Sequence, residues 1–180
     1  MILTGESIAR EVAAGRVVIE PFDPWHIEPN SYGFHLGRHL LCGDDPVSDA
    51  RQPPSTTRIE IPESGLVLLP QHLYLGETLE TMGSPHYAAT LYANRSTSCM
   101  GMWIQVSAPL GHTGAVIPWT LEIVVAHPVR VYPGMLIGKI AFWQPQGAVG
   151  GYCGKYSGSQ GVVASRISRE MRTNVAEAVS

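Results

Sequence analysis

The sequence predicts one mainly β domain whose strands form a distorted barrel or a jelly roll. Three observations support this fold class. Only 15% of the 180 residues are charged, 44% are apolar, and 19 Gly with 14 Pro supply many turns. Short β-branched runs recur at regular spacing, with almost no helical periodicity between them. A chain of this length, without internal repeats, is expected to be a single domain over residues 1–180.

The N-terminal segment MILTGESIAREV predicts a short amphipathic helix. Thr4 is the expected N-cap, Leu3 and Ile8 are placed to form a hydrophobic staple, and Gly15 can end the helix.

Strands are expected where apolar or alternating runs lie between turn formers, such as the Pro133-Gly134 turn. Stretches 21–33 and 43–57 are rich in Pro and polar residues and are expected to be loops. The expected strands are 17–20, 58–61, 65–69, 73–81, 87–93, 102–108, 115–125, 129–131 and 135–143.

The C-terminal part begins with a glycine-rich segment, 147–161, reading GAVGGYCGKYSGSQG. Such a segment can wrap phosphates through backbone N–H groups. The plainer interpretation, which its composition favours, is a flexible arm that crosses a neighbouring subunit. Residues 162–180 could form a helix.

Composition excludes several classes of function. A net charge of -3 argues against binding a nucleic-acid polymer, which needs a basic surface. Cys42, Cys99 and Cys153 have neither a disulfide framework nor zinc-site spacing. The sequence shows no signal-peptide pattern and no apolar run of membrane-spanning length, so the cytoplasm is the expected location.

The segment 92–125 carries the most chemistry. Glu122 lies within an apolar strand, where a partly desolvated carboxylate can act as a general base, although many strand acids simply face solvent. Arg95, Ser96 and Thr97 suit phosphate binding, whereas a lone arginine more often forms a surface ion pair. His112 lies between glycines and is most often an exposed turn residue, with a role in sugar contact or proton transfer as the second interpretation.

Several segments, in order along the chain, resemble the dCTP deaminases of the dUTPase superfamily. They are MILTGESI with GRVVIEPFDPWHIEPNSYGFHLG, ANRSTS, TLEI at 120–123, PGMLIGKIAF at 133–142 and GKYSGSQG at 154–161. The resemblance implies a dUTPase-type barrel with a short N-terminal helix and a C-terminal arm. It also implies a homotrimer with shared active sites, and zinc-independent deamination of dCTP with Mg²⁺ bound through the triphosphate.

The resemblance further implies a set of site residues. Glu122 would activate water for attack on C4 of the cytosine ring, the backbone near Ala108 would read the base edge, and no residue is expected to bind a metal. The expected substrate-binding residues are Arg95, Ser96, Thr97, Ala108, His112, Thr120, Tyr152, Lys155, Ser159 and Gln160.

The sequence departs from the family pattern at the site. The second arginine of the usual R-S-S-L-x-R-x-G block is missing near Cys99 and Met100. His112 replaces an acid that is central to the related dUTP diphosphatases, Gly33 replaces the acid of an S-Y-D motif, and Ser159 replaces a glutamine. Two interpretations remain open. The protein is a divergent deaminase of dCTP or a related cytosine nucleotide, or it is a relative with altered chemistry that hydrolyses nucleotide phosphates or only binds nucleotides.

Overall fold

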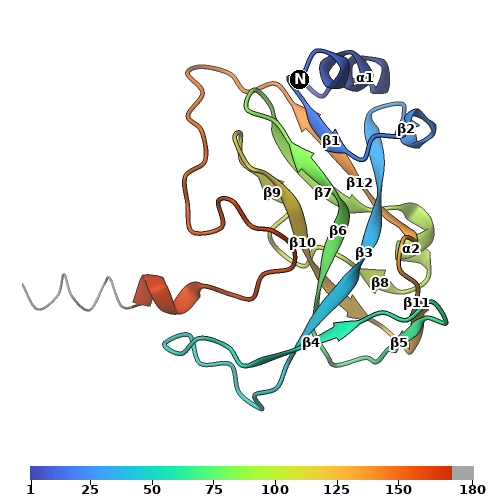
Figure 1. The fold of residues 1–180 in the computed structure, drawn as a ribbon, viewed down its shortest axis with the longest axis vertical. Coiled ribbons are helices and arrows are strands. Elements are labelled where there is room, and N and C mark those ends of the chain that lie inside the picture. The colour runs from blue at the N-terminus through green and yellow to red at the C-terminus, as the bar shows by residue number, and fades with distance from the viewer. Residues whose placement is uncertain (172–180) are drawn as a thin grey trace, which may run out of the picture.

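The computed structural model describes residues 1–171, and residues 172–180 lie outside the described part. Within the described part, a strongly curled ten-stranded sheet has the order β8-β10-β6-β3-β12-β7-β9, with β1 paired to β6 and with β2 and β4 paired to β3 (Figure 1). Strands β5 and β11 form a separate pair. The strands are β1 (Val18–Glu20), β2 (Ile27–Glu28), β3 (Ser31–Gly43), β4 (Thr56–Glu60), β5 (Leu66–Leu68), β6 (Tyr74–Gly83), β7 (Ala88–Ala93), β8 (Met102–Trp103), β9 (Leu110–Gly111), β10 (Val116–Val125), β11 (Val129–Val131) and β12 (Leu136–Trp143).

The mainly β fold class is therefore confirmed, and helices play a small part in it. The helices are α1 (Gly5–Ala13), the 3-10 turn η1 (Pro24–His26) and α2 (Arg95–Cys99). Residues 167–171 also adopt helical structure. The helix expected over 162–180 is wrong for residues 162–166, which are not helical, and its part over 172–180 lies outside the described residues. No helix in the described part is long and apolar enough to span a membrane.

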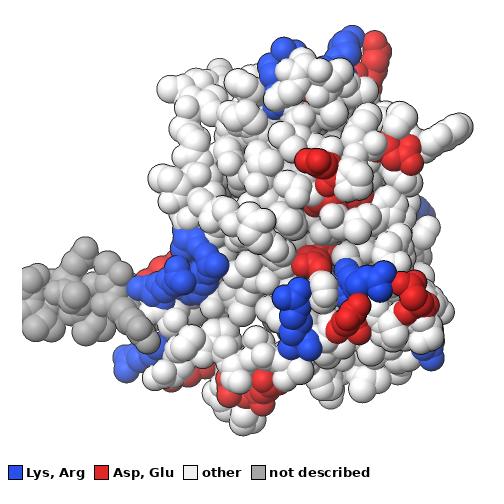
Figure 2. Space-filling model, viewed as in Figure 1, with Lys and Arg blue, Asp and Glu red and all other residues white. Residues whose placement is uncertain are grey.

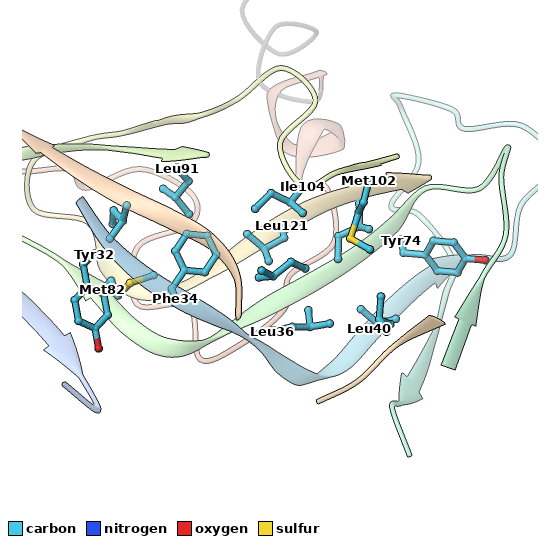
Figure 3. Packing of buried hydrophobic residues seen from close by; sticks show 14 of the residues in the cluster. Tyr32, Phe34, Leu36, Leu40, Tyr74, Met82, Leu91, Met102, Ile104 and Leu121 are labelled. Atoms are coloured by element: carbon cyan, nitrogen blue, oxygen red, sulfur yellow. The ribbon is translucent and has the colours of Figure 1, made fainter. Parts of the chain in front are cut away.

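Alternation along the long strands places one face of the curled sheet in the core. On β10, Leu121 and Ile123 are fully buried, whereas Glu122 between them is only half-buried. Figure 3 shows how side chains of β3, β6, β7 and β10 meet, with Phe34, Leu91 and Leu121 among them. Since successive side chains of a strand point to opposite faces, Glu122 must lie on the face away from this core.

The expected N-terminal helix is present with its expected boundaries. Thr4 caps α1 by accepting a hydrogen bond from the Ser7 amide, and Ile8 is fully buried. Gly15 follows the helix with a φ of 69°, which suits a residue without a side chain.

A carboxylate near the end of α1 ties the helix to the sheet. Glu11 accepts two hydrogen bonds from Arg16, at 2.6 and 2.7 Å, and one from the Tyr87 hydroxyl at 2.9 Å. The hydrogen bonds from Arg16 are the main cause that lowers the Glu11 pKa from 4.5 to about 2.

We expect this link to weaken in acid. Because the folded-state pKa of Glu11 is depressed, its stabilising contribution is complete above pH 4.5 and is lost as the pH falls towards 2. An NMR titration of the side-chain carboxyl groups should place the Glu11 midpoint near 2, and Arg16→Gln should move it towards 4.5. Arg51→Gln, in an exposed loop, is the control, and an unmoved Glu11 midpoint in Arg16→Gln would contradict the assignment.

A buried acid–histidine pair joins the two central strands. Glu80 on β6 is 1% exposed, and its Oε1 lies 2.5 Å from Nδ1 of His35 on β3. Its Oε2 accepts the backbone amide of His35 at 2.9 Å. The ring of His26 contacts His35 edge-on, with 4.4 Å between the ring centroids. Glu80 is therefore satisfied by one residue that supplies both a ring nitrogen and an amide.

Two expectations about the strands were wrong. Residues 21–33 are not all loop, because they contain η1 and β2 and β3 begins at Ser31. The strand expected over 102–108 stops at Trp103, since the following backbone amides bond to the Glu122 carboxylate rather than to a neighbouring strand.

Candidate active site

Glu122 is held by the loop that follows β8. Its Oε2 accepts the backbone amides of Val106 at 3.0 Å and Ser107 at 3.2 Å. Its own backbone amide donates to the carbonyl of Ile104 at 2.9 Å. No described residue donates to its Oε1, so one carboxylate oxygen is fixed and the other is available to a ligand or water.

The same loop brings Ala108 to the carboxylate. Ala108 is exposed and follows Ser107 directly, and the carbonyl of Pro109 accepts the Leu91 amide of β7 at 3.0 Å. The loop is thus tied to β10 at one end and to β7 at the other. The backbone of Ala108 therefore follows directly on the two amides that bond to Glu122.

One polar atom in this loop lacks a partner. Oε1 of Gln105 is buried and is the only such side-chain atom without a hydrogen bond among residues 1–171. An unpaired buried acceptor costs roughly 1–3 kcal/mol, which is the desolvation penalty that no bond repays.

We therefore expect Gln105→Met to stabilise the isolated chain slightly. Replacing the amide by an apolar side chain of similar shape removes the unpaired acceptor, and the melting temperature should rise by about 2–4 °C for a gain near 1 kcal/mol. Gln52→Met, in an exposed loop, should leave it unchanged. A clear fall in melting temperature for Gln105→Met would mean that the amide has a partner in solution.

Arg95, Ser96 and Thr97 form the first turn of α2. Asn94 caps this helix, with its Oδ1 accepting the Thr97 amide at 2.7 Å and its Nδ2 donating to the Leu136 carbonyl at 3.0 Å. Arg95 and Ser96 are exposed, and within the described part Arg95 forms no ion pair. Thr97 is only 2% exposed, so its hydroxyl packs against the protein rather than facing a ligand. The NRST sequence is therefore a capped turn that presents Arg95 and Ser96.

His112 packs against the glycine-rich arm. Its ring stacks on Tyr152, with centroids 5.4 Å apart and planes 19° apart. The Tyr152 amide donates to the Thr113 carbonyl at 2.8 Å. A Cβ on Gly114 would lie 2.8 Å from the Tyr152 nitrogen, so a glycine is needed where the arm approaches. In this single chain the arm therefore lies against its own barrel.

The remaining arm residues form a basic cluster around Tyr156. Lys155 pairs with Glu170, whose hydrogen bond raises the Lys155 pKa, and lies 5.2 Å from the Tyr156 ring centroid. Arg166 lies over the same ring and donates to the Lys155 carbonyl. Figure 2 shows basic side chains gathered where the arm meets the tail, the part of the chain that begins at Val162, while elsewhere on this face acidic and basic side chains are interspersed.

Ser159 and Gln160 differ in their access to a ligand. Ser159 is 7% exposed and its hydroxyl donates to the Tyr156 carbonyl at 2.7 Å, which makes it part of the internal structure of the arm. Gln160 is exposed, and its Nε2 lies 3.5 Å from the Gly158 carbonyl. Thr120 lies on β10, two residues before Glu122, and its hydroxyl accepts the Val163 amide at 3.1 Å.

Sequence reasoning missed two features of this region. One is Gln105, a polar residue in an otherwise apolar run, a signal that was visible in the sequence. The other is the pair of His39 and Glu77, whose Nδ1 and Oε1 lie 2.8 Å apart. These residues are 38 positions apart, so only the pairing of β3 with β6 brings them together.

Comparison with solved structures defines the class of fold. A structure described as 2'-deoxycytidine 5'-triphosphate deaminase from Agrobacterium tumefaciens matches with a TM-score of 0.63 at 19% sequence identity. The match covers 78% of this chain but only 47% of that one. At this identity the likeness concerns the fold alone, and it places the chain among mainly β domains with this strand arrangement.

Sequence comparisons identify the family. The family described as dCTP deaminase-like matches residues 2–145. A protein named "dCTP deaminase, dUMP-forming" from Clostridium beijerinckii is 37% identical over 171 residues, which is 94% of this chain and 98% of that protein. A "dCTP deaminase" from Rhodopirellula baltica is 36% identical over 95% of this chain and 86% of its own length. The chain belongs to the dCTP deaminase-like family.

Proposed function

We propose that the protein deaminates a cytosine nucleotide by hydrolysis, converting dCTP or a close relative of it to the uracil nucleotide and ammonia without zinc. The observation that carries this proposal is the arrangement around Glu122. One carboxylate oxygen is fixed by two backbone amides next to Ala108, and the other is available to a water molecule. The names of the relatives at 36–37% identity point to the same substrate.

In the proposed reaction Glu122 moves protons in both halves. The carboxylate takes a proton from water while the water oxygen bonds to C4 of the ring, and it passes that proton to N3. It then takes the remaining hydroxyl proton and delivers it to the amino group, so that the C4–N4 bond breaks, ammonia leaves and the C4 carbonyl forms. Because Oε2 is fixed, the Glu122 carboxylate would keep its Oε1 directed towards the cytosine ring through both steps.

In the trimer proposed below, the phosphates would lie between α2 of one subunit and the arm of a neighbouring subunit, because α2 and the arm lie on opposite sides of a single chain (Figure 1). Arg95 and Ser96 are exposed donors on α2, and Tyr152, Lys155 and Gln160 are the candidates on the arm. Lys155 would exchange Glu170 for phosphate oxygens, since both are anionic partners. No group of three His, Cys, Asp or Glu side chains in residues 1–171 is placed to hold a metal ion. Mg²⁺ would then be held by the phosphate oxygens and enter with the substrate.

A second candidate function adds removal of pyrophosphate. Several relatives at 36–37% identity are named dUMP-forming, which favours dUMP as the final product. His112 stands where the related diphosphatases carry an acid, which argues for dUTP instead. A phosphohydrolase without deamination, or a protein that only binds nucleotides, is the further alternative.

One assay separates these functions. Ammonia and pyrophosphate are measured together, with Mg²⁺, over dCTP, dCMP, CTP, CMP and dUTP. Ammonia alone supports the dUTP-forming deaminase, and ammonia with an equal amount of pyrophosphate supports the dUMP-forming one. Phosphate or pyrophosphate without ammonia, or binding without turnover, overturns the proposal.

We place the reaction in the cytoplasm.

We also propose a homotrimer with active sites at the subunit contacts. The surface near Glu122 exposes several large apolar side chains, which suits burial against another copy. Trp103 is 53% exposed, Val106 57% and Leu110 58%. Light scattering should give three times the monomer mass for the wild type, and Trp103→Glu should give mostly monomer.

The matched control is Val47→Glu, which adds the same charge at a 76% exposed position in a surface loop. It should remain trimeric. A wild-type monomer, or an intact trimer in Trp103→Glu, would exclude an interface at this surface.

A further inference from the structure

A second acid lies next to the candidate base on the outer face of the sheet. Glu77 on β6 is the register partner of Thr120 on β10, two residues from Glu122. Its side chain is only 13% exposed, and its Oε1 lies 2.8 Å from Nδ1 of His39. Its Oε2 accepts the backbone amide of Val162 at 3.0 Å.

The tail is bonded to both strands at consecutive residues. The Val162 amide donates to Glu77 on β6, and the Val163 amide donates to the Thr120 hydroxyl on β10 at 3.1 Å. Because Thr120 and Glu122 lie two apart on one strand, they share a face of the sheet. The tail therefore crosses the outer face immediately beside Glu122, while the 104–107 loop closes the opposite side.

Two glycines make room for this contact. A Cβ on Gly161, whose φ is +135°, would lie 2.8 Å from Oε2 of Glu77. A Cβ on Gly37 would lie 2.5 Å from Cγ of the same side chain. Glu77 is thus packed between β3 and the tail, and a side chain at either glycine would displace it or the tail.

We infer that Glu77, held by His39, is a positioning residue that fixes the tail as a wall of the active site. A carboxylate that accepts a backbone amide forms a stronger hydrogen bond than a neutral acceptor, so the position of residues 161–163 is set before substrate arrives. These residues directly follow Ser159 and Gln160, so the same contact sets where the arm can close on a nucleotide. The inference rests on the proposed function for its kinetic consequence, but not for the contact itself.

Hydrogen exchange tests the contact without any assay of activity. In Glu77→Ala, the amides of Val162 and Val163 should exchange at least about tenfold faster, since the loss of one charge-assisted hydrogen bond is worth a factor of about ten or more. Glu77→Gln keeps an acceptor oxygen and should retain most of the protection. Glu60→Ala, an exposed acid on β4, is the control. Unchanged exchange in Glu77→Ala overturns the inference.

Steady-state kinetics tests the positioning role. Glu77→Ala should raise the KM for dCTP about tenfold and leave kcat within about twofold, because residues 161–163 lose their fixed position while Glu122 is intact. Gly161→Ala should have a similar effect by pushing the tail away from Glu77. The double variant should then be no worse than either single variant, because both break one contact.

The experiments distinguish failure of the positioning role of Glu77 from failure of the proposed deamination. Additive losses in the double variant, or an unchanged KM with fast exchange, would show that the tail contact does not serve the reaction. If the wild type releases no ammonia, the proposed deamination fails. The positioning role for that reaction then fails with it, while the exchange result still decides whether Glu77 holds the tail.

Discussion

Glu122→Gln should abolish ammonia release and leave the fold intact. The amide retains an oxygen that can accept the Val106 and Ser107 amides, so the 104–107 loop should stay in place. It cannot take a proton from water at neutral pH, and loss of a general base costs roughly 10²–10⁴ in rate. Turnover of dCTP in the coupled assay should therefore fall by at least about a hundredfold.

Two measurements make this result specific. The melting temperature of Glu122→Gln and its affinity for dCTP should stay close to the wild-type values, which separates lost chemistry from lost structure. Glu20→Gln, an exposed carboxylate at the end of β1, should keep full activity. Retained turnover in Glu122→Gln would remove this residue from the mechanism.

His35→Leu should be the most destabilising single change at a polar residue of the core. It leaves Glu80, 2% exposed at its side chain, without its ring partner between the two central strands. Breaking a buried pair by removing one partner costs about 3–5 kcal/mol. For a chain of this size, a loss of about 3 kcal/mol lowers the melting temperature by about 6–12 °C.

A double variant shows whether the stranded carboxylate is the cause. When both partners become apolar, no buried charge remains, so His35→Leu combined with Glu80→Leu should recover much of the loss. His86→Ala, which removes an exposed histidine, should have little effect. If the double variant were less stable than His35→Leu, packing rather than an unpaired charge would explain the result.

The sequence was most informative where local patterns and packing agree. Strand β10 and its position around Glu122 follow from a long run of mostly apolar residues, and the capping signals at Thr4 predicted α1 correctly. Strand β3 was missed because SYGFHLGRHLLCG mixes Gly, His and Arg among its apolar residues. Burial between β6 and β12 outweighs that weak local preference.

The candidate site likewise has features that the sequence predicted and features that depend on long-range packing. Residue types suggested Glu122 and Arg95, and the structure places Glu122 on β10 and Arg95 at the start of α2. The partners of Glu122 could not be predicted, because they are backbone amides whose positions depend on how the loop is anchored at Leu91. The burial of Thr97 and the contact between Glu77 and the tail likewise depend on long-range packing.

The position of β3 at the centre of the sheet has a consequence for biosynthesis. Its neighbours are β6, which ends at Gly83, and β12, which ends at Trp143. During synthesis on the ribosome, β3 therefore has an unpaired edge until most of the polypeptide has emerged. Such exposed edges promote association between nascent chains, and pairing over long sequence separations is slow. We expect the yield of native protein to depend more on translation rate and chaperone supply than the stability of the finished fold would suggest.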